Sequence, residues 1–448
     1  MQCTVNKPNM QVFVGTFVHS TVDTPMVILK DSVLGVHNSK IKFLEKVEKL
    51  DQLREKYGFE NSCITHMTQS QFMMPGMVDT HIHAPQFPHN GLKLDQKLSE
   101  WLMTYTLPLE QEYSNVKMAR DVFTKVVNRL LRNGTTTASY YGSIHLGAVK
   151  VLADVAHAKG QRALVGKDNR LLSQEVGSEP GVQESLRDTE AFICYVNGIK
   201  SPLVQPILTP SWGLACSIDQ LKGLGELAKK YNCPMQSHLH EIKGEATLRA
   251  DNCHPNSHPN ILEGFAISGL LGKKTIMAHC IWVDDDDLEQ LRMNGVGVAH
   301  CPNSNLSLRS GFCDVRRYLE KGMKVGLGTD CSAGYSPSLL NAIRCAVHVS
   351  NTLSILRPNY QQLSVQECFR LATLGGAQVV SMEDRIGNFE VGKEFDSLLV
   401  DTEVPNTPLD VFDEDTAEEK IQRFLFNGDD RNIVRVFVAG RCVFNQDL

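Results

Sequence analysis

Six ligand-type residues of this chain are spaced as the parts of a metal-dependent catalytic site would be. Each stands at or just past the end of a short apolar run, although the runs lie far apart in the sequence. The set consists of His81, His83, His238, Glu241, His279 and Asp330. A catalytic Zn²⁺ holds three or four nitrogen or oxygen ligands at about 2.0–2.2 Å and leaves one position for water. The pattern therefore predicts a one-metal hydrolytic site built from imidazoles and a carboxylate, without thiols.

His81 and His83 form the first part of this site. The segment Phe72–His83 reads as a β-strand, and successive side chains of a strand point to opposite faces. The two histidines therefore project to the same face, where both can bind one ion. Ile82, between them, is expected to face a core.

Seven further β-rich runs follow, separated by stretches of helical periodicity such as Ser217–Lys230 and Val283–Asn294. These runs are Thr135–Tyr141, Arg162–Lys167, Val204–Pro210, Pro234–His240, Lys274–Cys280, Gly295–Cys301 and Lys324–Asp330. Strands that alternate with helices are typical of a parallel sheet. Eight of them favour an α/β fold of the (β/α)8 TIM-barrel type, whose active sites lie at the carboxyl ends of the strands.

The remaining site residues fall at that end of the predicted barrel. His238, His279 and Asp330 close strands five, six and eight. Elsewhere Glu241 would be an ordinary surface carboxylate, but three residues past His238 it is a candidate proton shuttle.

Two other histidines on these strands are expected to be structural. His240 has the opposite parity to His238, so it should point outward beneath a helix. His300 closes strand seven, where a structural role, or an indirect one beside the pocket, is favoured.

The ends of the chain predict a second module. At 448 residues the chain suits a barrel with an appended domain. Strand patterns occur before residue 71 and return after about Ser381, and neither piece alone buries two faces of a sheet. We expect residues 1–71 and 381–448 to be the halves of a small β-sandwich, and residues 72–380 to be the barrel.

Composition limits the partners and the compartment. The 13 cysteines are scattered and odd in number, which indicates reduced thiols and a cytoplasmic protein. A net charge of −6 with interspersed signs argues against a nucleic-acid surface. No apolar run approaches the ~20 residues that span a bilayer, and the first residues lack a signal-peptide pattern. We expect a small-molecule substrate, with no nucleic acid and no membrane.

Seven longer motifs resemble the amidohydrolase superfamily, and within it the guanine deaminase family, over nearly the whole chain. They are Pro75–Gln86, Gln236–Glu241, Met277–His279, His300–Leu308, Gly326–Asp330, Arg370–Gly376 and Gly387–Asp396. The resemblance implies a barrel with a composite β-sandwich from both termini. It also implies a cytosolic, zinc-dependent homodimer that converts guanine to xanthine and ammonia.

The resemblance also implies a role for each site residue. The metal ligands would be His81, His83, His238 and Asp330. His279 would orient the water, Gln86 would contact the base, and His238 would also line the substrate pocket. Zinc lowers the pKa of bound water towards ~7. Asp330 would accept the water's proton, and Glu241 would protonate a ring nitrogen and then the departing amine.

One segment departs from the family pattern. Guanine deaminases read Pro-Arg-Phe at the end of strand four, where the arginine recognises the purine oxo group and the phenylalanine stacks. Here the segment is Pro210-Ser211-Trp212. Trp212 can still stack on the base, but Ser211 cannot replace a bidentate cation. We hypothesise that Arg309, directly after the His300–Leu308 motif, restores the charge; a related 2-amino-4-oxo ring such as dihydropterin stays open as an alternative substrate.

Other interpretations are weaker. A two-metal amidohydrolase needs a bridging lysine, for which Lys167 at the end of strand three is a candidate. A non-enzymatic scaffold of this superfamily tends to lose ligands, whereas all of them are present here. A cytidine-type deaminase needs Pro-Cys-x-x-Cys, which does not occur in this sequence. Iron would suit the same ligands as zinc.

Overall fold

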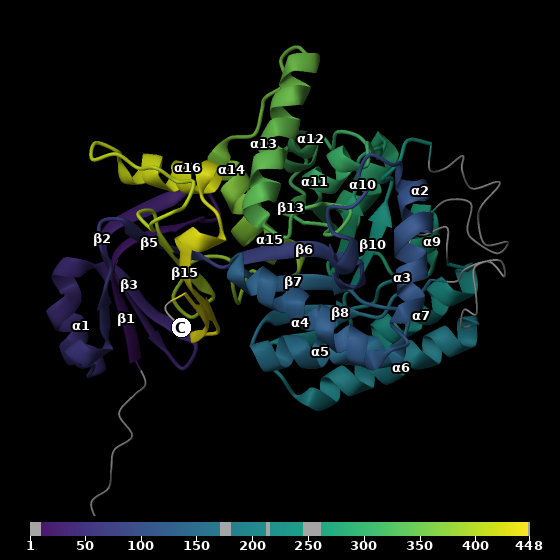
Figure 1. The fold of residues 1–448 in the computed structure, drawn as a ribbon, viewed down its shortest axis with the longest axis horizontal. Coiled ribbons are helices and arrows are strands. Elements are labelled where there is room, and N and C mark those ends of the chain that lie inside the picture. Colours follow the sequence, from purple (N-terminus) through teal and green to yellow (C-terminus); the bar gives the residue numbers. More distant parts are fainter. Residues whose placement is uncertain (1–9, 171–180, 212–215, 245–260, 447–448) are drawn as a thin grey trace, which may run out of the picture.

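Parallel strands that alternate with helices make up the middle of the chain (Figure 1). The computed structural model describes residues 10–170, 181–211, 216–244 and 261–446. Its middle part holds two four-stranded parallel sheets, with strand orders β6-β7-β8-β9 and β10-β11-β12-β13. The strands are β6 (Met77–His83), β7 (Thr135–Tyr141), β8 (Arg162–Gly166), β9 (Val204–Pro206), β10 (Met235–Leu239), β11 (Thr275–His279), β12 (Gly297–His300) and β13 (Lys324–Leu327). The predicted α/β class with parallel strands is confirmed.

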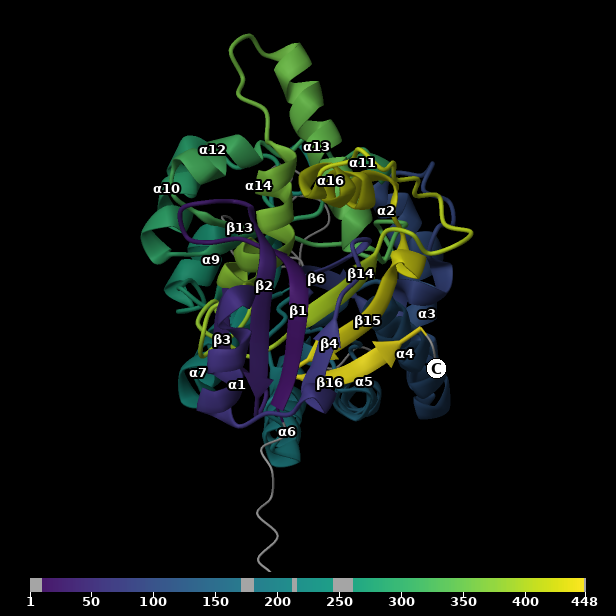
Figure 2. The same ribbon diagram turned by 90° about the vertical axis from the view of Figure 1, so that its left-hand side faces the viewer.

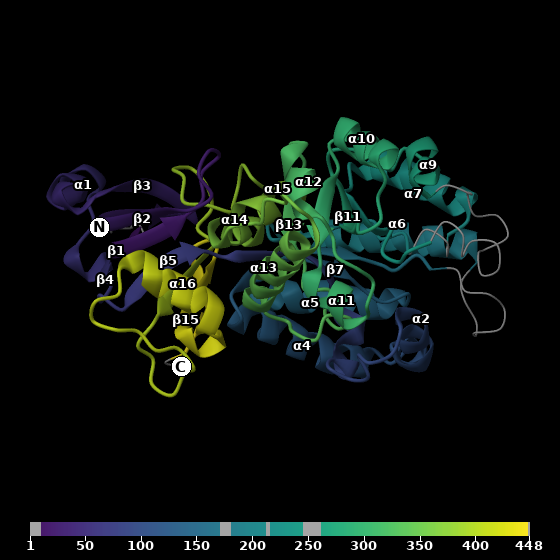
Figure 3. The same ribbon diagram turned by 90° about the horizontal axis from the view of Figure 1, so that it is seen from above.

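Helices follow these strands and lie around them (Figures 1 and 3). Their bounds are α2 (Leu98–Trp101), α3 (Leu107–Glu112), α4 (Val116–Arg132), α5 (Leu146–Lys159), α6 (Val182–Ile199), α7 (Ile218–Tyr231), α9 (Ile261–Ile267), α10 (Asp285–Asn294), α11 (Pro302–Ser307), α12 (Val315–Glu320), α13 (Leu339–Leu356), α14 (Val365–Arg370) and α15 (Gly376–Val379). Asp284 caps α10, because its side chain accepts a hydrogen bond from the backbone N–H of Asp287. The bounds of α7 and α10 agree with the predicted helices at 217–230 and 283–294 within two residues at each end.

Hydrogen bonds join the two parallel sheets at both of their edges. On one side Leu208, just past β9, pairs with Met235 of β10 in a parallel bridge. On the other side the N–H of Asp330, past β13, donates to the carbonyl of His81 in β6 at 2.9 Å. Both sheets also contribute to one apolar cluster, with Leu164 from the first and Ile276 from the second.

The two ends of the chain meet in one sheet (Figure 2). Its strand order is β16-β15-β14-β5-β1-β2-β3, and β4 pairs with β1. The strands are β1 (Met10–His19), β2 (Val27–His37), β3 (Lys40–Lys46), β4 (Ile64–His66), β5 (Gln71–Pro75), β14 (Ser397–Asp401), β15 (Ile433–Val438) and β16 (Arg441–Asn445). Helices α1 (Leu50–Tyr57) and α16 (Ala417–Asn427) accompany it.

The prediction of one strand over Phe72–His83 is wrong. The segment forms two strands, of which β5 pairs with β1 and β14 in the terminal sheet, while β6 pairs with β7. Gly76 separates them, and a Cβ atom there would lie 2.1 Å from the Thr136 hydroxyl. Only glycine lets the chain pass this closely from one sheet to the other.

A buried ion pair connects the terminal sheet to the parallel strands. Nε of Arg162, at the start of β8, donates to Asp396 at 2.9 Å, and its Nη2 donates to Glu394 at 2.7 Å. The Arg162 side chain is fully buried. Burial alone would lower its pKa, but the two carboxylates raise the pKa above its usual value. The guanidinium therefore stays charged and fixes the C-terminal segment against β8.

Within the described ranges, α13 is long and apolar enough to cross a membrane. Half of that window is buried in the protein, where Leu340, Ile343 and Val347 join the largest apolar cluster. The core helix of a folded domain has the same properties.

We predict that Arg162→Met lowers the free energy of unfolding by about 3–5 kcal/mol, because it leaves the buried carboxylate of Asp396 without its cation. Arg132→Met is the matched control, since Arg132 also pairs with an aspartate at 2.7 Å but is half exposed. Its cost should stay below about 1 kcal/mol. Urea unfolding followed by circular dichroism measures both, and equal costs for the two variants would contradict the role given to Arg162.

Candidate metal centre

Ligand atoms of His81, His83, His238 and Asp330 meet at the carboxyl ends of the strands. Nε2 of His83 lies 3.2 Å from Nε2 of His81 and 3.1 Å from Nε2 of His238. Oδ1 of Asp330 lies 3.4 Å from Nε2 of His81 and 3.5 Å from Nε2 of His83. Residues from β6, from β10 and from the loop after β13 therefore surround one point.

These separations fit a single metal ion. Two ligands about 2.1 Å from one ion at a tetrahedral angle lie about 3.4 Å apart, and the observed separations are 3.1–3.5 Å. The ligand types are nitrogen and oxygen, which suit zinc and also iron. The residues present therefore fit the metal that the sequence predicts.

Buried amides orient two of the imidazoles. Nδ1 of His81 donates to Oε1 of Gln236 at 3.3 Å, and Nδ1 of His279 donates to Oδ1 of Asn305 at 2.9 Å. Each bond fixes the proton on Nδ1 and leaves the lone pair of Nε2 facing the centre. Sequence analysis missed both amides, although Gln236 stands two residues before His238 on the same strand face and Asn305 lies in the quoted His300–Leu308 motif.

Burial keeps His83, His238 and His279 neutral. It lowers the pKa of His83 to about 3 and that of His279 to about 4, and it lowers the pKa of His238 well below its usual value. Burial alone would raise the pKa of Asp330, but its hydrogen bond with His81 and its electrostatic interactions with the neighbouring imidazoles hold it below its usual range. At neutral pH these three imidazoles are therefore unprotonated and Asp330 is a carboxylate, the forms that bind metal.

The two oxygens of Asp330 face different groups. Oδ1 lies among the ligand nitrogens, whereas Oδ2 lies 3.8 Å from Nε2 of His279. Oε2 of Glu241 lies 3.8 Å from the same nitrogen. His279 therefore stands between two buried carboxylates, and all three side chains can share a small reactant.

Two of these residues, His279 and Asp330, have a left-handed backbone conformation. His279 and Asp330 have φ angles of +69° and +45°, a conformation that costs a non-glycine residue about 1–3 kcal/mol. Asp79 holds the second of these turns, because its carboxylate accepts from the N–H and the hydroxyl of Thr329 at 3.0 and 2.6 Å. Burial raises the pKa of Asp79 to about 6. Sequence analysis missed Asp79, which has the strand parity of His81.

Of the predicted substrate-binding residues, Gln86 and Ser211 are buried and Arg309 is exposed. Gln86, on the 3-10 turn Ala84–His89 after β6, is buried, and its Oε1 has no hydrogen-bond partner among the described residues. Ser211 is buried past β9 and accepts from Arg170. Arg309 is exposed and donates to the carbonyl of Asp95 at 2.9 Å. Trp212 lies outside the described residues.

Three further residues bear on the predicted structural roles of two histidines and on the two-metal alternative. His240 is structural as predicted, with Nε2 2.7 Å from Asp287 of α10. His300 is fully buried, and both of its ring nitrogens lack partners in the described part of the chain. Lys167 donates to the Asp168 carbonyl at 3.2 Å, a contact that gives a two-metal centre no support.

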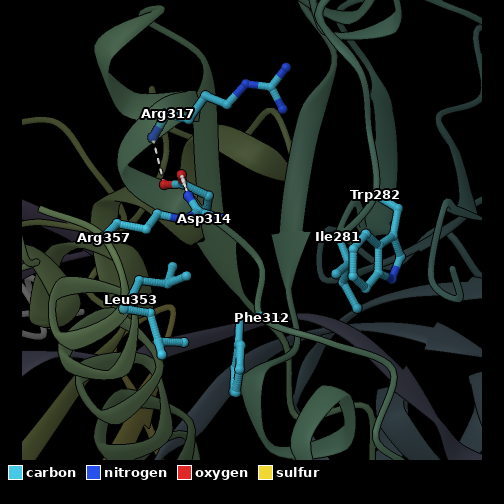
Figure 4. Close-up of a pocket in the computed structure, with 8 residues that line it drawn as sticks. Ile281, Trp282, Phe312, Asp314, Arg317, Leu353 and Arg357 are labelled. Carbon is cyan, nitrogen blue, oxygen red and sulfur yellow. Dashed lines mark hydrogen bonds and ion pairs between the residues drawn. The ribbon is translucent and has the colours of Figure 1, made fainter. Parts of the chain in front are cut away.

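A surface groove of about 250 Å³ contains none of the predicted site residues (Figure 4). It lies between α13 and the segments after β11 and α11. Ion-paired Asp314 and Arg357 flank it. Its apolar walls are Ile281, Trp282, Phe312, Leu353 and Leu356.

Comparison with known proteins agrees with the motifs. The model of the amidohydrolase family matches residues 72–443. Guanine deaminase of Mus musculus is 43% identical over 448 residues and 98% of both chains, and that of Homo sapiens is 43% identical over 442 residues and 97% of both. The solved guanine deaminase from C. acetobutylicum with guanine bound in the active site has a TM-score of 0.87 and 32% identity, covering 97% of this chain and 100% of that chain. The resemblance inferred from the motifs is thereby confirmed.

We predict that His238→Ala loses most of the bound zinc, whereas His240→Ala retains it. The two histidines lie two residues apart, but only His238 directs Nε2 to the cluster. Inductively coupled plasma mass spectrometry of dialysed protein measures the zinc content. Full zinc content in His238→Ala, or equal loss in both variants, would contradict the assignment of ligands.

Proposed function

The chain belongs to the amidohydrolase family, and from this premise we propose that it hydrolyses guanine to xanthine and ammonia. The observation that carries the proposal is the position of His279 Nε2, 3.8 Å from both Asp330 and Glu241, beside the cluster of ligand atoms. Relatives named guanine deaminase that match over 97–98% of their length support the choice of substrate.

We assign the metal ligands to His81, His83, His238 and Asp330, with one zinc per chain. Zinc bound there would supply acidity, because it lowers the pKa of a water ligand to about 7. Iron satisfies the same ligand set, so the choice of zinc rests on the family resemblance.

Asp330 deprotonates the attacking water and His279 orients it. Oδ2 of Asp330 accepts its first proton, because this oxygen faces away from the ligand nitrogens and towards His279. The lone pair of His279 Nε2 accepts a hydrogen bond from the same water, since Asn305 fixes the ring proton on Nδ1. The water is thereby aimed at the ring carbon that bears the amino group.

Glu241 transfers protons on the substrate side. Its carboxyl donates a proton to the ring nitrogen next to that carbon, so that the carbon accepts the water oxygen and becomes tetrahedral. Glu241 then takes the proton of the new hydroxyl group, which becomes the oxo group, and passes it to the amine; the carbon–nitrogen bond breaks and ammonia leaves. The proton held by Asp330 returns to Glu241 and restores the starting state. One water is consumed for each ammonia released.

The substrate assignment favours guanine over a pterin ring. Ser211 raised the alternative, but the relatives reported above are named for guanine. The buried, unpartnered Oε1 of Gln86 offers an acceptor for a ring N–H, and an unpaired buried oxygen otherwise costs about 1–3 kcal/mol.

The fold proposal is a closed (β/α)8 barrel over residues 72–380, with residues 1–71 and 381–448 forming a β-sandwich. Hydrogen bonds at both edges between the parallel sheets and the apolar cluster common to them support closure. The pairing of β5 with β1 and β14 favours a boundary near Gly76 rather than residue 71.

A cytoplasmic homodimer completes the proposal. The cysteines of the described segments are all free thiols, which suits a reducing compartment. The dimer rests on the family resemblance.

We predict that Glu241→Gln retains zinc but lowers turnover of guanine by about 10²–10⁴-fold, since a positioned proton donor is lost. Ammonia release and metal content are measured on the same preparation. Glu226→Gln, an exposed carboxylate on α7, is the control and should keep wild-type turnover. Near-normal turnover in Glu241→Gln would remove its assigned role, and faster ammonia release from dihydropterin than from guanine in the wild type would contradict the substrate.

A further inference from the structure

Arg170 is a cation that follows strand β8 by four residues, at the same carboxyl end of the strands as the proposed ligands. Asp168, two residues earlier, forms a parallel bridge with Thr209, just past β9. The segment that carries Arg170 is therefore tied to the segment that carries Ser211.

Two buried side chains hold the guanidinium. Its Nη2 lies 2.8 Å from Oδ2 of Asp168, and its Nε donates to the hydroxyl of Ser211 at 3.4 Å. The side chain of Arg170 is 16% exposed and that of Asp168 4% exposed. A cation held this way keeps a fixed orientation, because two nitrogens of its planar fork are bound.

A short chain of contacts connects this cation to the metal ligands. The hydroxyl of Tyr141 donates to the carbonyl of Pro210, next to Ser211, at 2.8 Å. The Tyr141 ring stacks on His83 with the ring centres 4.7 Å apart and lies 5.0 Å from the His238 ring. Tyr141 therefore contacts two of the proposed ligands and the residue next to Ser211, which holds Arg170.

We propose that Arg170 binds the ring carbonyl oxygen of the purine substrate and selects oxo-purines, with Asp168 and Ser211 holding it in place. This inference rests on the proposed function. A small hydroxyl at Ser211 accepts a hydrogen bond from Arg170, where a long side chain would compete for the same space. Arg170 donates to the oxygen, while Gln86 Oε1 accepts from a neighbouring ring N–H, so the two residues complement adjacent atoms of one base edge.

The alternative cation, Arg309, stays a prediction. It is exposed, and its contact is with a backbone carbonyl of the loop at Asp95. The contacts of Arg170 with buried groups beside the ligands favour Arg170.

The test uses zinc-loaded full-length protein. Arg170→Met is expected to raise KM for guanine about 10- to 100-fold, the typical effect of losing a charged hydrogen bond, with a smaller change in kcat. Isothermal titration calorimetry should show a similar loss of affinity for xanthine, which keeps the ring carbonyl oxygen of guanine. It should show no loss of affinity for 2-aminopurine, which lacks that oxygen. Arg170→Lys keeps the charge but not the fork, and should fall between.

Two controls separate recognition from damage to the fold. Arg132→Met removes an ion-paired arginine at the end of α4 and should keep wild-type KM. Arg170→Met leaves the buried carboxylate of Asp168 without its cation. The double variant Arg170→Met/Asp168→Asn removes both charges; this protein should keep its zinc and still lose affinity for xanthine.

Each of the following results would overturn the inference. Wild-type affinity for guanine and xanthine in the double variant would do so, as would equal losses for xanthine and 2-aminopurine. Loss of guanine affinity in Arg309→Ala with none in Arg170→Met would assign the role to Arg309 instead. If the wild-type protein releases no ammonia from guanine, both the proposed function and this inference are wrong. If the wild type turns over guanine and Arg170→Met has the same KM for guanine as the wild type, only this inference is wrong.

Discussion

The close approach of three imidazole nitrogens and one carboxylate oxygen is the constraint on which the structure depends. Lone pairs that face one another at 3.1–3.5 Å in a buried site repel unless a cation lies between them. The surrounding residues hold this arrangement in place. Gln236 fixes the ring proton of His81, and the backbone hydrogen bond from Asp330 to His81 joins the segment after the last parallel strand to the first strand.

The same constraint organises the chemistry. One oxygen of Asp330 lies among the histidine nitrogens, whereas the other faces His279. Glu241 lies at the same distance from His279 Nε2, so in the proposed mechanism water and substrate meet beside two carboxylates with different tasks. Burial keeps His83 and His279 neutral, which leaves their lone pairs available.

Much of this could be predicted from the sequence, because strand parity and strand ends are local properties. The two-residue spacing of His81 and His83, and the positions of His238, His279 and Asp330 after apolar runs, predict that these five side chains lie together, as the structure has them. The division of Phe72–His83 into β5 and β6 could not be predicted, since it depends on pairing with β14, more than 300 residues away. The role proposed for Arg170 was missed for the same reason, because its contact with Ser211 joins the ends of two strands that lie 41 residues apart in the sequence.

Zinc K-edge X-ray absorption on the zinc-loaded protein tests the central claim most directly. The account predicts only nitrogen and oxygen neighbours at about 2.0–2.2 Å, with the multiple-scattering signature of imidazole rings and no second metal nearby. The chain has 13 cysteines, so sulfur at about 2.3 Å is a real alternative. A sulfur shell, or a metal–metal distance near 3.5–4 Å, would contradict the single histidine and aspartate centre.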